Sequence, residues 1–532
     1  MFRSVAKTAA GVVLGLLAIA AQPNPAYAAP IKVQIAGAGS TWSQPALRAW
    51  IGNVTQFGLK VSYADTGSTD GRKQFANGKV DFGISEIPYG MPDSATRDID
   101  SPPTGRGYAY MPIVAGGTSF MYNLTIGGKR VTNLRLAGDT IAKIFTNKIT
   151  FWDDPQIKRD NPKLPLPNRK IIPVVRSDGS GTSAQFTLWL SKQHQDVWGE
   201  FCRSVGRNQS PCGLTSYFPV ISGKNIGQSG SNGVSGYVAQ PRYEGAITYV
   251  EYSYAKTAKF PVVKVLNKKG YFVEPTDTAV AVAMTHATIN ADLTQNLDNV
   301  YTNEDKRTYP LSSYSYMVLP TDLRMQMNEN KGFTLAEFAH YFLCKGQAQV
   351  DDLGYSPLPR NLVDAAAAQV ARIPGSAASP WDVTKCQNPT FGPNGENALA
   401  TTAPYPPECD NVQSGDQCTT GTGGAGPTTV GGGGGSGGGG TGGTATTGPS
   451  ASASASAAVV VDPDTGETLD AARAAGGNDV AGVPVSLDQA GTWGLRRALM
   501  IVAGALLIGL IFGPPMLSRS LGGRRDRDGG RR

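Results

Sequence analysis

The chain is poor in histidine and lacks the motifs that indicate metal, nucleotide or serine-hydrolase chemistry. It has three histidines in 532 residues, and none of its six cysteines forms a CxxC pair, so we expect neither a metal site nor a cofactor. No GxxxxGK[ST] segment occurs, which excludes an NTPase-type phosphate loop. Three scattered histidines also argue against a Ser-His-Asp assembly. We therefore expect no catalytic residues.

The chain has little excess charge once its two ends are set aside. Its formal net charge is +7, from 48 basic and 41 acidic residues. Two basic residues lie in the first 28 positions, and eight basic and two acidic residues lie from Arg496 onward. The segment between them has 38 basic and 39 acidic residues, so the sequence shows no nucleic-acid footprint.

The N-terminus has the pattern of a secretory signal peptide over residues 1–28. Arg3 and Lys7 precede an apolar run from Gly11 to Ala21, and Ala26-Tyr27-Ala28 forms a small-x-small cleavage site. An uncleaved anchor is the alternative, but the apolar run is short for a membrane span. The sequence therefore predicts export of the chain.

The C-terminal region has the pattern of a membrane anchor. Residues 498–517 carry no charge, and twenty helical residues can cross about 30 Å of hydrocarbon. The stronger basic cluster follows in residues 518–532 and is expected to stay in the cytoplasm. We therefore expect the bulk of the protein on the extracytoplasmic face of the membrane, with single-pass anchoring.

The six cysteines lie in the exported part of the chain, where disulfides persist. Six cysteines allow fifteen pairings. We expect the local pairs Cys202–Cys212 and Cys409–Cys418, which leaves Cys344–Cys386; structural zinc is the alternative.

Residues 30–372 alternate strand-like and helix-like stretches, which indicates an α/β fold. The first expected strands are 32–36, 59–64 and 80–84, and the first expected helices are 42–52 and 70–77. The region is long for one core, so we expect two lobes. From about residue 419 the chain is Gly/Ser/Ala-rich and low in complexity, a composition that cannot bury a core.

Three expected strand-to-helix turns combine glycine with serine and threonine. They are Gly37–Trp42, Thr66–Gly71 and Asp178–Ser183, and Arg176 precedes the third. A helix N-terminus offers free N–H groups to an anion, and glycine allows close approach of the backbone. The alternative is simple helix capping; Thr182 and Gln185 have the spacing of a capping box.

Eight motifs in order across residues 31–365 make the chain similar to the phosphate-binding proteins of bacterial ABC importers. These motifs are GAGSTW from Gly37, YADTGSTDGRKQ from Tyr63, VDFGISE from Val80, IAKIFTNKITFWDDPQI from Ile141, VVRSDGSGTS from Val174, GAITYVEYSYAK from Gly245, YPLSSYSYMVL from Tyr309 and LGYSPLP from Leu353. The tail from about residue 375 lies outside the resemblance.

The resemblance implies a two-lobed periplasmic binding protein fold of type II that closes on phosphate by hinge motion. The implied partners are inorganic phosphate and the permease subunits of an importer. The ligand residues carried over by motif are Thr41, Trp42 (by its backbone N–H), Ser68, Glu86, Arg176, Ser180, Gly181 and Thr182. Asp178 would pair with Arg176, and the side chains of Trp42, Phe151 and Trp152 would pack in the core or between lobes.

Glu86 is a departure from the family pattern, which has aspartate after the FG-x-S of this strand. A buried carboxylate there can accept a hydrogen bond from the proton of monohydrogen phosphate, whereas sulfate offers it only lone pairs. Glutamate keeps this chemistry but is one methylene longer. The alternative is that Glu86 is a solvated loop residue, and arsenate would not be distinguished from phosphate.

The expected organisation of the chain has eight segments. They are 1–28 signal peptide, 29–115 first part of lobe I, 116–309 lobe II, 310–375 second part of lobe I, 376–418 Cys-containing extension, 419–495 flexible linker, 498–517 transmembrane helix and 518–532 basic cytoplasmic tail. The expected function is capture of phosphate between the lobes and delivery to an importer. A surface adhesion or sensing module and a secreted hydrolase such as a phosphatase are the alternatives.

Overall fold

An eight-stranded sheet forms the centre of the computed structural model, which describes residues 29–95 and 100–427. The strand order is β2-β1-β3-β15-β4-β10-β8-β9. The bounds are β1 Ile35–Gly39, β2 Val61–Ala64, β3 Phe82–Ser85, β4 Tyr108–Tyr122, β8 Ile172–Arg176, β9 Ile226–Gln228, β10 Ala246–Glu251 and β15 Ser312–Pro320. The α/β class expected from the sequence is confirmed.

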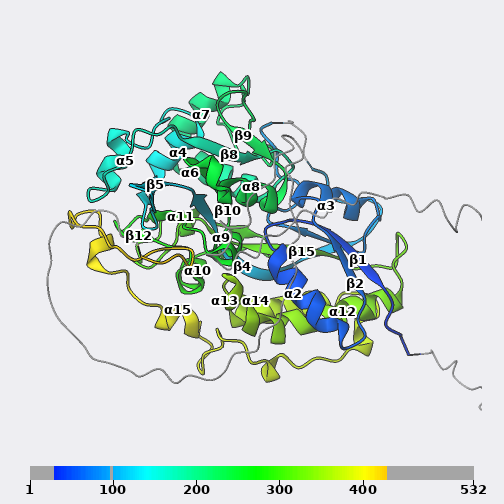
Figure 1. The fold of residues 1–532 in the computed structure, drawn as a ribbon. Coiled ribbons are helices and arrows are strands. Elements are labelled where there is room, and N and C mark those ends of the chain that lie inside the picture. The colour runs from blue at the N-terminus through cyan, green and yellow to red at the C-terminus, as the bar shows by residue number, and fades with distance from the viewer. Residues whose placement is uncertain (1–28, 96–99, 428–532) are drawn as a thin grey trace, which may run out of the picture. The chain divides into compact units, whose positions relative to one another are not determined.

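The sheet consists of two parallel groups joined by two antiparallel strands. Strand β1 runs parallel to β2 and β3, and β8 runs parallel to β9 and β10. Strands β15 and β4 pair antiparallel with each other and connect the groups, as Figure 1 shows near the middle of the molecule. We call β1–β3 and their helices the β1 half, and β8–β10 and their helices the β8 half.

Helices of the β1 half are α2 Gln44–Thr55, α3 Ser68–Ala76, α12 Glu329–Leu343 and α14 Arg360–Val370. Pro45 occupies the first turn of α2, where its missing N–H costs nothing. Trp50 of α2 stacks on Phe342 of α12 with ring centroids 5.0 Å apart. This contact ties the N-terminal segment to a helix almost 300 residues later.

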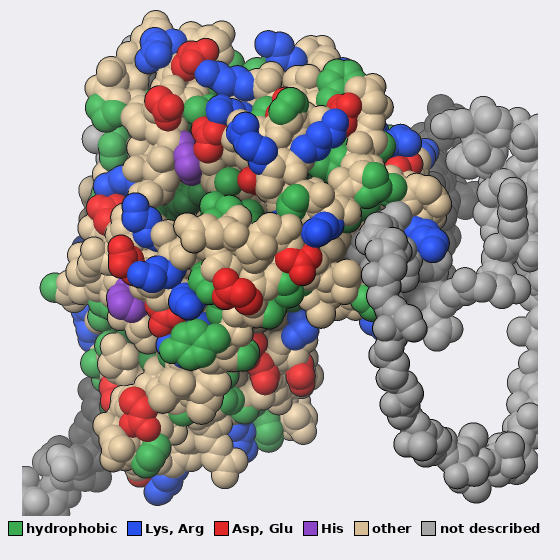
Figure 2. Space-filling view, turned by 90° about the vertical axis from the view of Figure 1, so that its left-hand side faces the viewer, with side chains coloured by type: hydrophobic (Ala, Val, Ile, Leu, Met, Phe, Trp, Pro, Cys, Tyr) green, Lys and Arg blue, Asp and Glu red, His purple; other side chains and the backbone are tan. Residues whose placement is uncertain are grey.

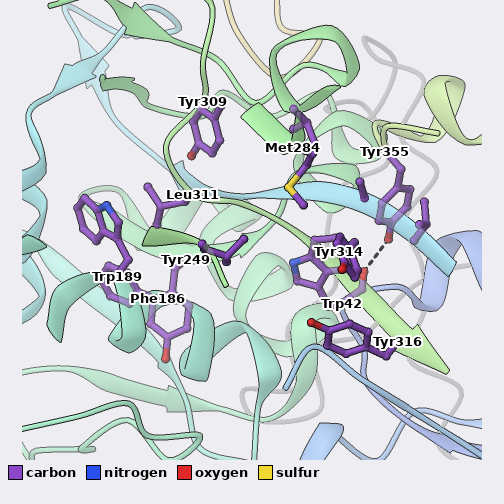
Figure 3. Packing of buried hydrophobic residues seen from close by; sticks show 14 of the residues in the cluster. Trp42, Phe186, Trp189, Tyr249, Met284, Tyr309, Leu311, Tyr314, Tyr316 and Tyr355 are labelled. Carbon is purple, nitrogen blue, oxygen red and sulfur yellow. Dashed lines mark hydrogen bonds between the residues drawn. The ribbon is translucent and has the colours of Figure 1, made fainter. Parts of the chain in front are cut away.

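Helices of the β8 half are α4 Gly138–Phe145, α5 Pro155–Asp160, α6 Gly181–Gln193, α7 Gln195–Ser204 and α8 Gly230–Ala239. An aromatic cluster packs between these helices and the sheet. The ring centroids of Phe186 on α6 and Tyr249 on β10 lie 4.9 Å apart. Figure 3 shows these two residues with Trp189 on one side of the core and Trp42 on the other. The core is therefore continuous across both halves of the sheet.

The remaining elements are short and lie around the sheet. They are β5 Thr125–Ile126, β6 Lys129–Arg130, β7 Arg135–Leu136, α9 Tyr252–Ala258, β11 Lys264–Leu266, β12 Phe272–Val273, α10 Asp277–Met284, β13 Thr288–Ile289, β14 Gln295–Asn296, α11 Asp298–Tyr301, α13 Val350–Leu353 and α15 Ala398–Thr402. Single 3-10 turns occur at Pro241–Tyr243, Lys345–Gln349, Ser376–Ala378, Val383–Lys385 and Glu408–Asp410.

The expected aromatic packing is confirmed for two of three residues. Trp42 is fully buried, and the Tyr355 hydroxyl donates to the Trp42 carbonyl at 2.6 Å (Figure 3). Trp152 is also buried and donates from its indole to the Gly245 carbonyl at 3.0 Å. Phe151 is 42% exposed, so the expectation was wrong there. Phe151 lies in an extended bridge to Lys170, where successive side chains point to opposite faces.

The three expected disulfides are present. The structure joins Cys202 to Cys212, Cys344 to Cys386 and Cys409 to Cys418. The second bridge fastens the extension after residue 375 to the end of α12.

The extension continues across the molecule to the three-stranded sheet β12-β11-β7, as the yellow segments of Figure 1 show. Lys264 of β11 and Asp410 form a buried ion pair at 2.6 Å. The backbone N–H of Thr422 donates to the Thr132 carbonyl at 3.0 Å, and Thr422 is 1% exposed. The expectation of a flexible linker from residue 419 is therefore wrong for 419–427, because hydrogen bonds rather than apolar side chains hold that stretch.

Within the described ranges, no helix is long and apolar enough to cross a membrane. The expected signal peptide (1–28), the rest of the expected linker (428–495), the expected span (498–517) and the expected tail (518–532) lie outside the described residues.

On the face in Figure 2, acidic and basic side chains are intermingled.

Candidate anion-binding site

The three turns expected to hold an anion meet at one place. Turns leading from β1 to α2, from β2 to α3 and from β8 to α6 follow the carboxyl ends of parallel strands, where α/β folds place their ligands. The Gly67 N–H donates to the Gly39 carbonyl at 2.8 Å, and the Thr69 N–H donates to the Gly179 carbonyl at 3.1 Å. The Gly181 N–H donates to the Ser68 hydroxyl at 3.0 Å. These bonds connect all three turns.

The structure brings together every residue that the sequence predicted as a ligand. All eight are buried, and the seven other than Gly181 have a relative exposure of 3% or less; the residues are Thr41, Trp42, Ser68, Glu86, Arg176, Ser180, Gly181 and Thr182. The first four belong to the β1 half and the last four to the β8 half. The site therefore lies between the two halves.

Arg176 ends β8 and is held by Asp178, as expected. Its Nε donates to Asp178 Oδ1 at 2.7 Å, and a second guanidinium nitrogen contacts Oδ2. Burial by itself would raise the pKa of Asp178, but the hydrogen bonds and charge of Arg176 outweigh it, and the pKa is lowered. The Tyr249 hydroxyl accepts from the backbone N–H of Arg176 at 3.1 Å. The guanidinium is thus fixed in direction and its charge is offset.

Glu86 is fully buried at the end of β3, so the alternative of a solvated loop residue is wrong. Its Oε2 accepts from the hydroxyls of Ser40 and Ser68 at 2.8 and 2.7 Å. Its Oε1 accepts from Ser315 of β15 at 2.9 Å. Burial raises the pKa of Glu86, and the three hydroxyl donors partly offset this effect.

Gly181 makes room for the longer carboxylate. A Cβ at this position would lie 1.9 Å from Glu86 Oε2 and 2.5 Å from Ser68 Oγ. Such distances are far below van der Waals contact, so only glycine allows the start of α6 to approach Glu86 this closely.

The start of α6 differs from the capping box suggested by the sequence. The hydroxyl of Ser180 is the cap and accepts from the Ser183 N–H at 3.1 Å. Gln185 instead donates across the site to the Glu86 carbonyl at 2.7 Å, and the Thr182 hydroxyl finds no hydrogen-bond partner among the described residues. Buried hydroxyls are normally hydrogen-bonded, so the Thr182 hydroxyl stands out at the start of α6.

Three further residues contact the site and were not predicted from the sequence. Ser40 and Ser315 lie within quoted motifs, but only the structure shows that both bond to Glu86. The third is Ser231, whose hydroxyl lies 2.8 Å from that of Thr41. A signal for Ser231 was present, because Ser229-Gly230-Ser231 is a fourth Gly/Ser turn between a strand and a helix.

The chemistry of the site is that of a hydrogen-bonding cradle. One arginine is paired with one aspartate, the Glu86 carboxyl is an acceptor, and hydroxyl and backbone donors supply the remaining polarity. Among the described residues, no group of three or more His, Cys, Asp or Glu side chains could hold a metal ion. The arrangement can bind an oxyanion through shaped donors rather than through net positive charge.

Comparison with known proteins agrees with this class of fold and site. Residues 24–345 match the PBP superfamily domain, so the protein is a member of that superfamily of binding proteins. The chain is 31% identical over 331 residues to the phosphate-binding protein PstS of Haemophilus influenzae, covering 62% of this chain and 90% of that one. It is 32% identical over 351 residues to the PstS of Methanocaldococcus jannaschii, covering 63% and 84%. The chain belongs to the PstS family.

A solved structure of a phosphate-binding protein from Stenotrophomonas maltophilia also matches. It covers 63% of this chain and 93% of that one, with 18% identity and a TM-score of 0.46.

Proposed function

We propose that this protein binds inorganic phosphate between the β1 and β8 halves and delivers it to an ABC importer. The observation that carries the proposal is the joint burial of Arg176, Glu86 and three helix starts at one point between the halves. Membership of the PstS family supports phosphate as the ligand.

A dianion such as phosphate is costly to bury unless its oxygens are hydrogen-bonded. Arg176 offers a planar fork, and the starts of α2, α3 and α6 offer hydroxyl and N–H donors. The unpartnered hydroxyl of Thr182 is one such donor. Asp178 offsets the arginine charge, so the site selects shape and donor pattern more than charge.

Selectivity would come from Glu86. An ionised Glu86 accepts a hydrogen bond from the proton of monohydrogen phosphate, whereas fully ionised sulfate would oppose it with a lone pair. Protonation of Glu86 by acid is expected to remove this acceptor role. Because burial raises the pKa of Glu86, the loss should set in at a higher pH than it would for an exposed glutamate. Arsenate carries a similar proton and is a second ligand of the same site.

The halves are proposed to move as two lobes of a type II binding protein. Lobe I consists of residues 29–115 and 310–375, and lobe II consists of residues 116–309. Strands β4 and β15 connect the two lobes. Contacts such as Ser68 to Gly181 cross between the halves and would form on closure. Outside the described residues, export by 1–28 and anchoring by 498–517 would place this carrier on the extracytoplasmic face of the membrane.

The alternatives receive less support. A hydrolase needs a nucleophile activated by a nearby base or a metal, but the residues assigned to the site include no histidine and no cysteine, and the serines donate to Glu86 as hydrogen-bonding groups. A sensing or adhesion module on a stalk is compatible with phosphate binding but does not require Arg176 or Glu86. The proposed role is therefore binding and transport rather than catalysis.

Titration calorimetry of the full-length protein with phosphate and sulfate tests this function. The wild type is expected to bind phosphate and to reject sulfate. Glu86→Gln removes the ionised acceptor while keeping nearly the same size, so the preference for phosphate should fall by about 100-fold, equivalent to about 2.7 kcal/mol.

Glu274→Gln is a matched control, because Glu274 is a half-buried carboxyl elsewhere that accepts from the Tyr252 hydroxyl at 2.5 Å. This variant should retain the preference for phosphate. Absence of phosphate binding at micromolar concentrations by the wild type would refute the function. Unchanged selectivity in Glu86→Gln would refute only the acceptor role.

A further inference from the structure

A fourth helix start lies against the predicted site. Helix α8 begins at Gly230 after β9 and belongs to the β8 half. Ser231, in its first turn, is fully buried. Neither the sequence motifs nor the comparisons assign a role to this residue.

Ser231 contacts two residues predicted to bind the anion. Its hydroxyl lies 2.8 Å from the Thr41 hydroxyl, and its backbone N–H donates to the same Thr41 oxygen at 3.1 Å. A guanidinium nitrogen of Arg176 donates to the Ser231 hydroxyl at 3.3 Å. The Ser231 hydroxyl therefore lies within hydrogen-bond distance of two expected ligands of phosphate.

We propose that Ser231 is itself a phosphate ligand, donating from its hydroxyl at the start of α8. This inference rests on the proposed function. A phosphate oxygen that accepts from both Thr41 and Arg176 would lie within reach of Ser231, because the Ser231 hydroxyl contacts both of these groups. Hydroxyl hydrogens rotate freely, so the bond between Thr41 and Ser231 can be exchanged for two bonds to one anion oxygen.

The position of α8 does not depend on the Ser231 hydroxyl. The Gly230 N–H donates to Asp178 Oδ1 at 3.0 Å, which fastens the helix start to the residue that orients Arg176. Val234 and Val238 bury the apolar side of α8. Gly230 has φ +69°, a conformation that glycine adopts readily, and this brings Ser231 next to Thr41. Removal of the hydroxyl should therefore leave the fold intact.

Ser231 and Thr41 lie on opposite sides of the site. Thr41 belongs to the β1 half, whereas Ser231 belongs to the β8 half. A ligand held by both would connect the halves, so loss of Ser231 should act mainly by faster release of phosphate.

The test compares phosphate dissociation constants and release rates of full-length Ser231→Ala with the wild type. A hydrogen bond to a charged group predicts about 10-fold to 100-fold weaker binding. Ser235→Ala is the matched control, because Ser235 is one turn further along α8 and bonds to the Ser231 carbonyl at 2.8 Å. The control should bind within about twofold of the wild type.

A second comparison distinguishes a ligand from a residue that only positions Thr41. In a Thr41→Ala background, a positioning role would leave Ser231→Ala without further effect, whereas a ligand role predicts a further loss of at least about threefold. Wild-type binding with no effect of Ser231→Ala in either background overturns this inference alone. Failure of the wild type to bind phosphate overturns the proposed function and the inference with it.

Discussion

Replacement of Arg176 by alanine is expected to abolish measurable phosphate binding and to lower the free energy of unfolding by about 3–5 kcal/mol. The binding loss follows from removal of the only guanidinium among the residues assigned to the site. The stability loss follows because Asp178, whose side chain is only 15% exposed, would be left without the partner that now donates to both of its oxygens. Calorimetry measures the first effect and urea denaturation the second.

Two further variants separate these effects. Arg176→Met combined with Asp178→Asn removes both charges, so most of the stability should return while phosphate binding stays lost. Arg169→Ala is a control for arginine removal, because Arg169 is 43% exposed in its ion pair with Glu244 and should cost at most about 1 kcal/mol. Phosphate binding by Arg176→Ala within tenfold of the wild type would contradict the assigned role of the guanidinium.

Much of the candidate site could be predicted from the sequence, because its parts are local motifs. Each of the three turns carries its glycine, its hydroxyl residues and its helix start within a few residues, and the pairing of Arg176 with Asp178 spans only two positions. The contribution of Ser315 could not be predicted from residues alone. Its bond to Glu86 joins positions 229 apart in sequence, and only the sheet pairing of β15 with β3 brings them together.

Ser231 was missed for a related reason. The Gly/Ser pattern before α8 equals that of the other turns, but the strand before it, β9, has only three residues. So short a strand carries no clear alternation of apolar and polar residues, and the turn could not be recognised as a strand-to-helix connection.

The boundaries of the first strand show how tertiary packing overrides local preference. The sequence favours a strand over residues 32–36, whereas β1 covers Ile35–Gly39 and includes two glycines. A Cβ at Gly37 would lie 2.0 Å from the Phe82 ring, and one at Gly39 would lie 2.1 Å from the Ile84 carbonyl. The close packing of β1 against β3 thus requires glycine at these positions, although glycine has a low propensity for strands.

The free energy of unfolding is expected to fall between pH 4.5 and 8 because of Glu251, the last residue of β10. Its Oε2 caps α9 by accepting from the Ser253 N–H at 2.7 Å, and its Oε1 has no hydrogen-bond partner within the described part of the chain. Burial raises the pKa of Glu251 from 4.5 to about 8. The folded chain therefore keeps a proton that the unfolded chain releases.

The sign follows from proton linkage. A raised pKa makes the contribution of Glu251 fully present below pH 4.5, and this contribution is lost as the pH rises through 8. One group gives a slope of about 1.4 kcal/mol per pH unit over that window. Glu251→Gln is neutral throughout. The unfolding free energy of the wild type minus that of the variant should therefore decrease from pH 5 to pH 8 and then stay constant.

Urea denaturation at several pH values between 5 and 9 measures this difference. Glu304→Gln controls for the loss of one carboxylate, because the Glu304 side chain is 71% exposed. Other acids with raised pKa values, such as Glu86 and Glu274, are common to wild type and variant and cancel in the comparison. A difference that is flat with pH would show that Glu251 is already ionised in the folded protein. A lowered pKa would also leave the difference flat above pH 5, because the folded and unfolded states would then both be ionised throughout this range.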